Sequence, residues 1–148
     1  MQNGLSLIET LVALVVLSVG LLGVAALQVH GLIAGRSANY RSHAANLAAD
    51  MAERIRSNPL GLDAYAGPGS DNSCTADAGE ALECTPEQMA AHDVFLWDRA
   101  IRTSLPVGDW RIEVDSESVP PGFRIAVTWV EPRHGQVEYL LPIRAMQR

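Results

Sequence analysis

Few side chains in this sequence have a type and spacing that could do chemistry. The histidines show neither metal-ligand spacing nor a neighbouring nucleophile, and they are scattered along the chain: His30, His43, His92 and His134. The sequence contains no glycine-rich phosphate loop, no G-x-S-x-G and no H-E-x-x-H. Each histidine is therefore expected at the surface or near a helix end. No catalytic residue, cofactor or metal site is expected, and the protein is predicted not to be an enzyme.

Glu9 is the other reactive group that the pattern singles out. It is the only Asp, Glu, Lys or Arg among the first 35 residues, and it precedes an apolar run, Leu11 to Leu27, close to the ~20 residues of a membrane helix. A carboxylate at the end of such a run raises the free energy of membrane insertion, so its presence indicates a functional role. A cleaved secretory signal fits poorly, because the leader Met1-Gln2-Asn3 has no basic residue. A generic single-pass anchor leaves Glu9 unexplained.

The helix that would carry Glu9 is predicted to continue beyond the apolar run. Small and apolar residues follow at helical spacing: Tyr40, Ala44, Leu47, Ala48, Met51 and Ile55. Pro59 ends this stripe, because a proline disfavours helical geometry in the residue before it. A continuous helix from Leu5 to Ser57 would be about 80 Å long at ~1.5 Å per residue. Its first part belongs in lipid or a helical bundle, and its second part can lay one face on a folded head.

The segment Gly4-Leu5-Ser6-Leu7-Ile8-Glu9-Thr10-Leu11-Val12 resembles the prepilin motif of type IV pilins: a glycine before the cut, a hydrophobic first mature residue and a glutamate at the fifth mature position. The resemblance implies that a membrane peptidase cuts after Gly4 and that Leu5 is N-methylated. It also implies an assembly role for Glu9, for which we expect a partner in the Leu5 amine of an adjacent subunit. In the alternative, Glu9 lies in the headgroup region or bonds its own N-terminus.

A second segment narrows the resemblance. The run Ala44-Ala45-Asn46-Leu47-Ala48-Ala49-Asp50-Met51-Ala52-Glu53-Arg54-Ile55-Arg56-Ser57-Asn58-Pro59 is similar to sequences of the PilV (type IV pilus modification protein) family. This implies a minor pilin that helps prime, or is incorporated into, a type IV pilus used in adhesion and twitching motility. The implied partners are other major and minor pilins, bound through the N-terminal helix, together with the prepilin peptidase and the inner-membrane assembly platform.

The same resemblance implies a single-pass protein of the bacterial inner membrane, with an extracytoplasmic C-terminal head that joins the pilus after assembly. This orientation rests on the motif, because Arg36 and Arg41 lie beyond the apolar run and oppose the positive-inside rule. A formal net charge of −6 argues against nucleic acid as a partner. Two other functions stay open: a minor pseudopilin of a type II secretion system, and a membrane-anchored extracytoplasmic binding module or enzyme that never polymerises.

The chain has two cysteines, Cys74 and Cys84, in a segment rich in Gly, Pro, Asp and Ser that we predict to be a loop. An extracytoplasmic location would let them form a disulfide. Two free thiols are the alternative, and a zinc site lacks further ligands at the right spacing. The loop also carries carboxylates that raise the question of a calcium site, although they lack EF-hand spacing and fit a solvated loop better: Asp63, Asp71, Asp77, Glu80 and Glu83.

The C-terminal part of the sequence predicts a helix followed by strands. Thr85-Pro86-Glu87-Gln88 has the pattern of a capping box, and an apolar stripe continues to Pro106. Alternating residues from Trp110 onward predict three or four antiparallel strands, and hence an α+β head of the pilin type. The predicted divisions are a leader, 1–4; a transmembrane or filament-core half-helix, 5–35; an amphipathic half-helix, 36–58; a disulfide-bonded loop, 59–84; and the helix and sheet of the head, 85–148.

Overall fold

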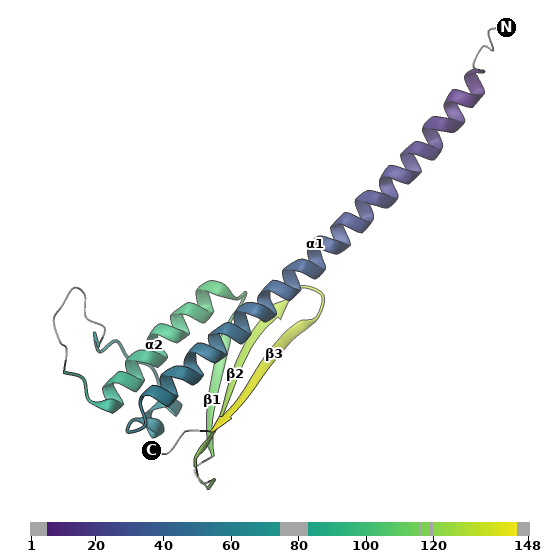
Figure 1. Ribbon diagram of the computed structural model, residues 1–148. Helices are drawn as coiled ribbons and strands as arrows, with labels where there is room; N and C mark the ends of the chain where they lie inside the picture. Colours follow the sequence, from purple (N-terminus) through teal and green to yellow (C-terminus); the bar gives the residue numbers. More distant parts are fainter. Residues whose placement is uncertain (1–5, 75–82, 116, 119, 145–148) are drawn as a thin grey trace. The chain divides into compact units, whose positions relative to one another are not determined.

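The computed structural model describes residues 6–74, 83–115, 117–118 and 120–144. Within these residues the chain forms helix α1 (Leu7–Ser57), the 3-10 helix η1 (Leu62–Ala66), helix α2 (Pro86–Ser104) and strands β1 (Asp109–Asp115), β2 (Gly122–Glu131) and β3 (Gly135–Arg144) (Figure 1). The chain divides into two compact units, Met1–Ala38 and Asn39–Arg148, and we call the second unit the head. Two main helices and one antiparallel sheet confirm the predicted α+β class.

Helix α1 includes both the apolar run and the amphipathic stripe. It ends at Ser57, two residues before Pro59, as the sequence predicted. The side chain of Asn58 then donates to the carbonyl oxygen of Pro86 at 2.7 Å. The end of α1 is therefore tied to the beginning of α2, 28 residues later in the chain.

Helix α2 begins with the predicted capping box. The Thr85 hydroxyl accepts from the backbone N–H of Gln88 at 3.2 Å, and the Thr85 N–H donates to the Gln88 side chain at 2.9 Å. Both bonds satisfy backbone or cap groups that the first turn of a helix leaves without partners. Pro86, at the start of the helix, costs nothing because its missing N–H would have had no helical acceptor.

The three strands form one antiparallel sheet in the order β1-β2-β3. Val127 lies opposite Trp110 on one side and Tyr139 on the other, which puts the apolar positions of the three strands on one face. The β2–β3 hairpin closes with a turn in which the His134 N–H donates to the Glu131 carbonyl, followed by Gly135 at φ +70°. Pro142 lies in β3, an edge strand, where a missing N–H can be tolerated.

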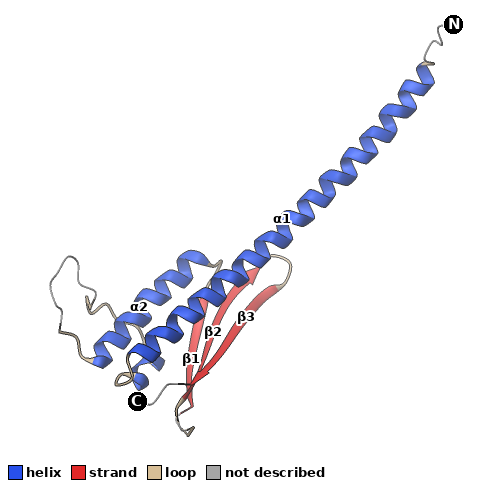
Figure 2. Cartoon of the chain, viewed as in Figure 1, coloured by secondary structure: helices blue, strands red, loops and turns tan. Residues whose placement is uncertain are grey.

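The core of the head lies between the inner face of the sheet and the two helices (Figure 2). The predicted stripe of α1 is confirmed, since Ala44, Ala48, Met51 and Ile55 are fully buried. Trp97 of α2 is also buried, and its indole N–H donates to the Leu47 carbonyl of α1 at 2.8 Å. The remaining largest buried side chains come mainly from α2 and β2: Trp129, Tyr65, Phe123, Ile101, Ile125, Val94 and Val127.

The segment between α1 and α2 is more ordered than the loop that the sequence predicted. It contains η1, and Tyr65 within η1 is fully buried in the core. A single 3-10 turn of five residues is too short to leave a helical period in the sequence. The residues around Tyr65 therefore show no periodic pattern that would have predicted its burial.

The prediction that every histidine lies at the surface or at a helix end is wrong for His92. His92 is 2% exposed in the middle of α2, and its Nδ1 accepts from the backbone N–H of Asn72 at 3.3 Å. The segment before Cys74 folds back over α2, where the Asn72 side chain donates to the Gln88 carbonyl at 2.8 Å. This long-range contact, rather than any local pattern, buries the imidazole.

A polar cluster links α1, η1 and α2 at the edge of the core. Arg54 of α1 donates to Asp93 of α2 at 2.7 Å and to Asp50, one turn earlier, at 2.9 Å. The Tyr65 hydroxyl donates to the other carboxylate oxygen of Asp93 at 2.9 Å. Hydrogen bonds to a charged group are among the stronger ones, so this cluster favours one relative position of the three elements.

Stability should fall at alkaline pH because of Tyr65. Burial raises the pKa of its hydroxyl above the ordinary value of 10.0, and the hydrogen bond to Asp93 raises it further. The folded state thus holds this proton more tightly than the unfolded state, so the free energy of unfolding should decrease above pH ~10, by at most ~1.4 kcal/mol per pH unit. The chain has no lysine and only three tyrosines, so few other groups titrate there.

Denaturant unfolding followed by tryptophan fluorescence between pH 8 and 11.5 measures this effect, with pH values chosen as about one unit or more on either side of the tyrosine pKa. The Tyr65→Phe variant should be less stable at neutral pH but lose less stability on alkalinisation. Equal pH slopes for the two proteins would contradict the assignment to Tyr65.

Candidate processing and assembly segment

The structure places one of the three predicted N-terminal site residues. Glu9 lies in the first turn of α1, with an exposed side chain, and its backbone N–H donates to the Ser6 carbonyl at 2.9 Å. Gly4 and Leu5 fall outside the described residues. The partial positive charge at a helix N-terminus favours a carboxylate in the first turn. The position of Glu9 thus suits an anion that is still available to a cationic partner.

The part of α1 that follows Glu9 exposes apolar side chains on every side. Leu and Val residues from Leu7 to Leu32 are 53–78% exposed, and none of the candidate membrane span is buried within the chain. Among the described residues, α1 is the one helix long and apolar enough to cross a membrane. A helix that is apolar all round requires lipid or other helices as its surroundings.

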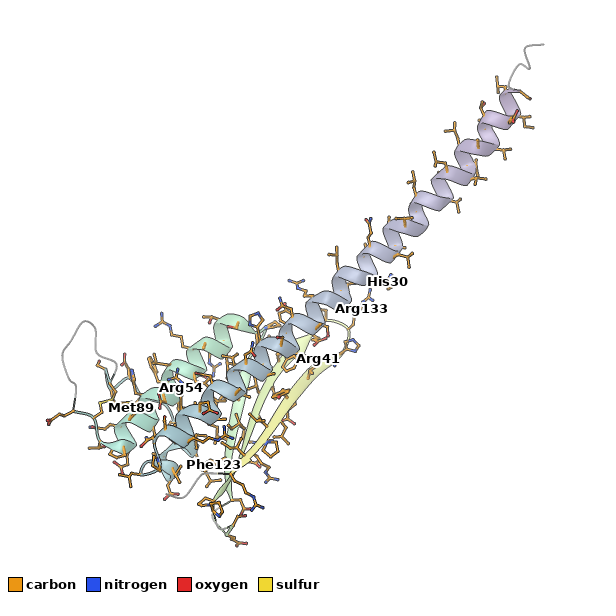
Figure 3. The ribbon with its side chains drawn as sticks, viewed as in Figure 1. His30, Arg41, Arg54, Met89, Phe123 and Arg133 are labelled. Carbon is orange, nitrogen blue, oxygen red and sulfur yellow. A yellow bond between two sulfur atoms is a disulfide. The ribbon has the colours of Figure 1, made fainter. Side chains whose placement is uncertain are left out.

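Three polar side chains within this apolar segment are bonded to their own helix. The hydroxyls of Thr10 and Ser18 donate to the carbonyls of Leu7 and Val15, each at 2.8 Å. His30, labelled in Figure 3, has its Nδ1 2.8 Å from the Ala26 carbonyl, a geometry in which Nδ1–H donates. Because lipid offers no hydrogen-bonding partners, these local bonds reduce the cost of placing such residues in hydrocarbon.

The head contains a disulfide between Cys74 and Cys84, with Cα atoms 5.9 Å apart. The bond joins the segment that covers His92 to the residue just before the Thr85 cap, so it closes the loop at the beginning of α2. Among the described residues, no three His, Cys, Asp or Glu side chains are grouped as metal ligands. Asp77 and Glu80, part of the acidic set considered for calcium, lie outside the described residues.

Two family models match consecutive parts of the chain. A prokaryotic N-terminal methylation motif matches residues 1–25, and the model of the type IV pilin Tt1218 matches residues 26–95. These matches support a type IV pilin. Its long N-terminal helix, second helix and three-stranded antiparallel sheet form the type IV pilin fold. The chain has no significant match among curated proteins or solved structures.

Membership of this family agrees with the site geometry. Type IV pilins are structural proteins, so this pilin is not an enzyme. The N-terminal methylation motif implies processing by a prepilin peptidase and assembly with other pilins, and the apolar helix agrees with membrane anchoring. The match to the Tt1218 pilin ends within α2, so the sheet of the head lies beyond the matched residues.

The sequence interpretation missed the polar cluster that links α1, η1 and α2 within the head. Asp50 and Arg54 are four residues apart, and this helical spacing is visible in the sequence. Asp93 and Tyr65, however, lie 39 and 11 residues after Arg54 in the chain, so no local spacing connects them to the pair. Covariation between such positions is the kind of signal that could have identified the partners.

The disulfide should contribute measurably to the stability of the head. In the chain-entropy account, closing a loop of this length adds about 2 to 3 kcal/mol to the free energy of unfolding. Replacing both Cys74 and Cys84 by Ser should lower the denaturant midpoint of the pilin, and chemical reduction of the native pilin should lower it by a similar amount. The Ser73→Ala variant is the control for a substitution beside the bond. A native pilin that unfolds identically with and without reductant would contradict a stabilising disulfide.

Proposed function

We propose that this pilin is a minor pilin of the PilV kind, which helps prime a type IV pilus or is incorporated into it. The observation that carries the proposal is Glu9, held in the first turn of a helix whose following surface is apolar on every side, within a matched N-methylation motif. Such a helix is suited to storage in the bacterial inner membrane and to transfer into a bundle of similar helices. The head, which follows the apolar part of the helix in the chain, lies on the extracytoplasmic side in this proposal.

In the proposed mechanism, residues 1–4 are a leader and the peptidase cuts after Gly4. The new N-terminus, Leu5, carries a methylated amine with a positive charge. Glu9 of one subunit pairs with this amine on the adjacent subunit. A carboxylate in hydrocarbon costs a few kcal/mol on insertion scales, and a cationic amine offsets part of this cost. The pairing therefore favours docking in one axial register.

Processing at the bond between Gly4 and Leu5 is the first expected consequence. In a strain with the prepilin peptidase, the intact mass of the mature pilin should match a chain that begins with N-methyl-leucine. A Gly4→Leu variant should accumulate as precursor in the membrane, while an Asn3→Ala variant should be processed normally. A mature chain that still begins at Met1 would refute the processing proposal.

The charge of Glu9 should be needed for assembly rather than for folding. Glu9→Gln and Glu9→Leu variants should insert, be cut after Gly4 and form the disulfide, but their abundance in sheared pili relative to the membrane pool should fall about tenfold or more. This factor corresponds to ~1.4 kcal/mol or more of lost pairing. Glu9→Asp keeps the charge and should retain part of the incorporation, and Thr10→Val is a neighbouring control.

Normal incorporation of the Glu9→Gln variant would contradict pairing with the Leu5 amine. Glu9 would then act in the headgroup region or on its own N-terminus. The partners that co-purify with native pilin after mild detergent extraction test the assembly system itself. Pilus subunits support a minor pilin, whereas components of a type II secretion system would identify a minor pseudopilin.

A further inference from the structure

The head has one end that must lie near the apolar segment. Three contacts run in opposite order along the two helices: Asn58 of α1 with Pro86, Arg54 with Asp93, and Leu47 with Trp97 of α2. The helices of the head are therefore antiparallel, and the C-terminal end of α2 lies beside the part of α1 where the head begins. We call this end of the head the basal end.

The β2–β3 hairpin lies at the same basal end. The loop after α2 contributes the carbonyl of Pro106, which accepts from the backbone N–H of Val130 at 2.9 Å. Val130 immediately precedes Glu131, where the hairpin turn begins. The loop between α2 and β1 and the hairpin turn are thus neighbours in space, although 20 or more residues separate them in sequence.

Four exposed residues at this end define what we call the basal patch: Arg41, Val107, Val130 and Arg133. Val107 is 79% exposed and Val130 is 39% exposed. Val107 also has φ +50°, a conformation that is strained for a β-branched residue. The fold thus keeps an apolar side chain in solvent at some conformational cost.

The two arginines of the basal patch have no ion-pair partner among the described residues. Salt bridges elsewhere in the head involve several other arginines, including Arg54 and Arg102, whereas neither Arg41 nor Arg133 has a carboxylate oxygen within 4.0 Å in the described part of the chain. Figure 3 labels Arg41 on α1 and Arg133 on the hairpin. These guanidinium groups are available to an external anion.

The carboxylates of the head are placed mainly away from the basal patch. Near it, Glu131 is 4% exposed and accepts from the Trp129 indole at 2.9 Å. Two exposed carboxylates at this end lie beside arginines: Asp109 is 3.9 Å from Arg102, and Glu138 is 3.5 Å from Arg111. Exposed carboxylates gather instead around η1 and the N-terminus of α2, at the opposite end of the helix pair: Asp63, Asp71, Glu83 and Glu87. The basal end is therefore the part of this acidic head that an anionic surface repels least.

Chain length limits how far the basal patch can lie from the apolar segment. Gly35 ends the stretch without charged residues, and Arg41 follows six positions later. Both residues belong to α1, whose rise of ~1.5 Å per residue separates them by about 9 Å. When the apolar segment is in a bilayer, Arg41 therefore lies within or close to the headgroup layer.

We propose that the basal patch binds anionic phospholipid headgroups of the membrane that holds α1. Arg41 and Arg133 contact lipid phosphates, while Val107 and Val130 enter the boundary between headgroups and acyl chains. The combination of cationic and apolar side chains is typical of interfacial membrane contacts. The inference rests on membrane anchoring by α1, but not on the pairing of Glu9. Its effect is to hold the head against the bilayer before the pilin leaves the membrane.

The test uses the full-length pilin, one copy per nanodisc, in bilayers of phosphatidylcholine alone or with about one third phosphatidylglycerol. Single copies exclude contacts between pilins. Hydrogen exchange is measured for peptides that contain 105–108 and 131–136. We expect exchange to slow severalfold with phosphatidylglycerol, and 0.5 M salt to reverse the slowing because it screens the arginines. Peptides from the opposite end, around η1, should exchange equally in both lipids.

A pair of double variants identifies the residues responsible. Arg41→Gln with Arg133→Gln should weaken the lipid contact by about fivefold per arginine, or about 25-fold in all, and abolish the slowing. Arg111→Gln with Arg124→Gln removes the same charge from the outer face of the sheet and should leave it intact. Val107→Ser should reduce the slowing at low salt, because it removes an apolar contact and leaves both arginines in place.

Equal exchange in the two lipids would overturn the proposal. The proposal would also be overturned if the Arg111 and Arg124 double variant lost the slowing as fully as the Arg41 and Arg133 double variant. Slowing that appears in phosphatidylcholine only when other pilins share the disc would assign the basal patch to a protein contact instead. None of these outcomes bears on the incorporation of Glu9 variants into pili, so the two proposals can fail separately.

Discussion

The structure of this pilin depends on a single helix that must satisfy two different environments. Up to about Gly35 the surface of α1 is apolar in every direction, whereas from Ala44 to Ile55 the buried residues lie on one side only. The second part supplies Ala44, Ala48 and Ala52, which are buried in the core of the head. Without this part, the inner face of a three-stranded sheet would have only α2 to cover it, which is a small core for a stable domain.

Hydrogen bonding keeps the two environments separate. In the apolar part, hydroxyl and imidazole groups donate to carbonyls in the preceding turn of the same helix, so they need no external hydrogen-bond partner. In the head, the side chains of Arg54 and Asn58 reach other elements instead. Among the described residues, no buried side-chain nitrogen or oxygen lacks a partner. Side-chain hydrogen bonds thus act locally in the apolar part of α1, where they need no neighbour. In the head they connect residues far apart in the sequence and so fix the relative position of the elements.

Much of the fold was accessible from the sequence because its signals are local. The stripe of α1, the capping box at Thr85 and the alternation of the strands each occupy one short stretch, and the structure confirms them. Tyr65 and His92 were not accessible, since what buries them is a segment that folds back from far along the chain. The same distinction holds for function: the motif around Glu9 is contiguous, whereas the basal patch exists only after three separate elements meet.

The edge strand β3 affects how the heads behave when many copies are crowded together. Proteins that polymerise hold many copies of their heads at very high local concentration, where a free, regular sheet edge invites another edge to pair with it. In β3 the row of outward N–H groups that includes Glu138 and Leu140 is interrupted at Pro142, which has no N–H to donate, and the Glu138 side chain adds a charge along the strand. Pairing between the β3 edges of neighbouring heads is therefore disfavoured. Growth of a filament can then be governed by the N-terminal helices and not by pairing between sheets.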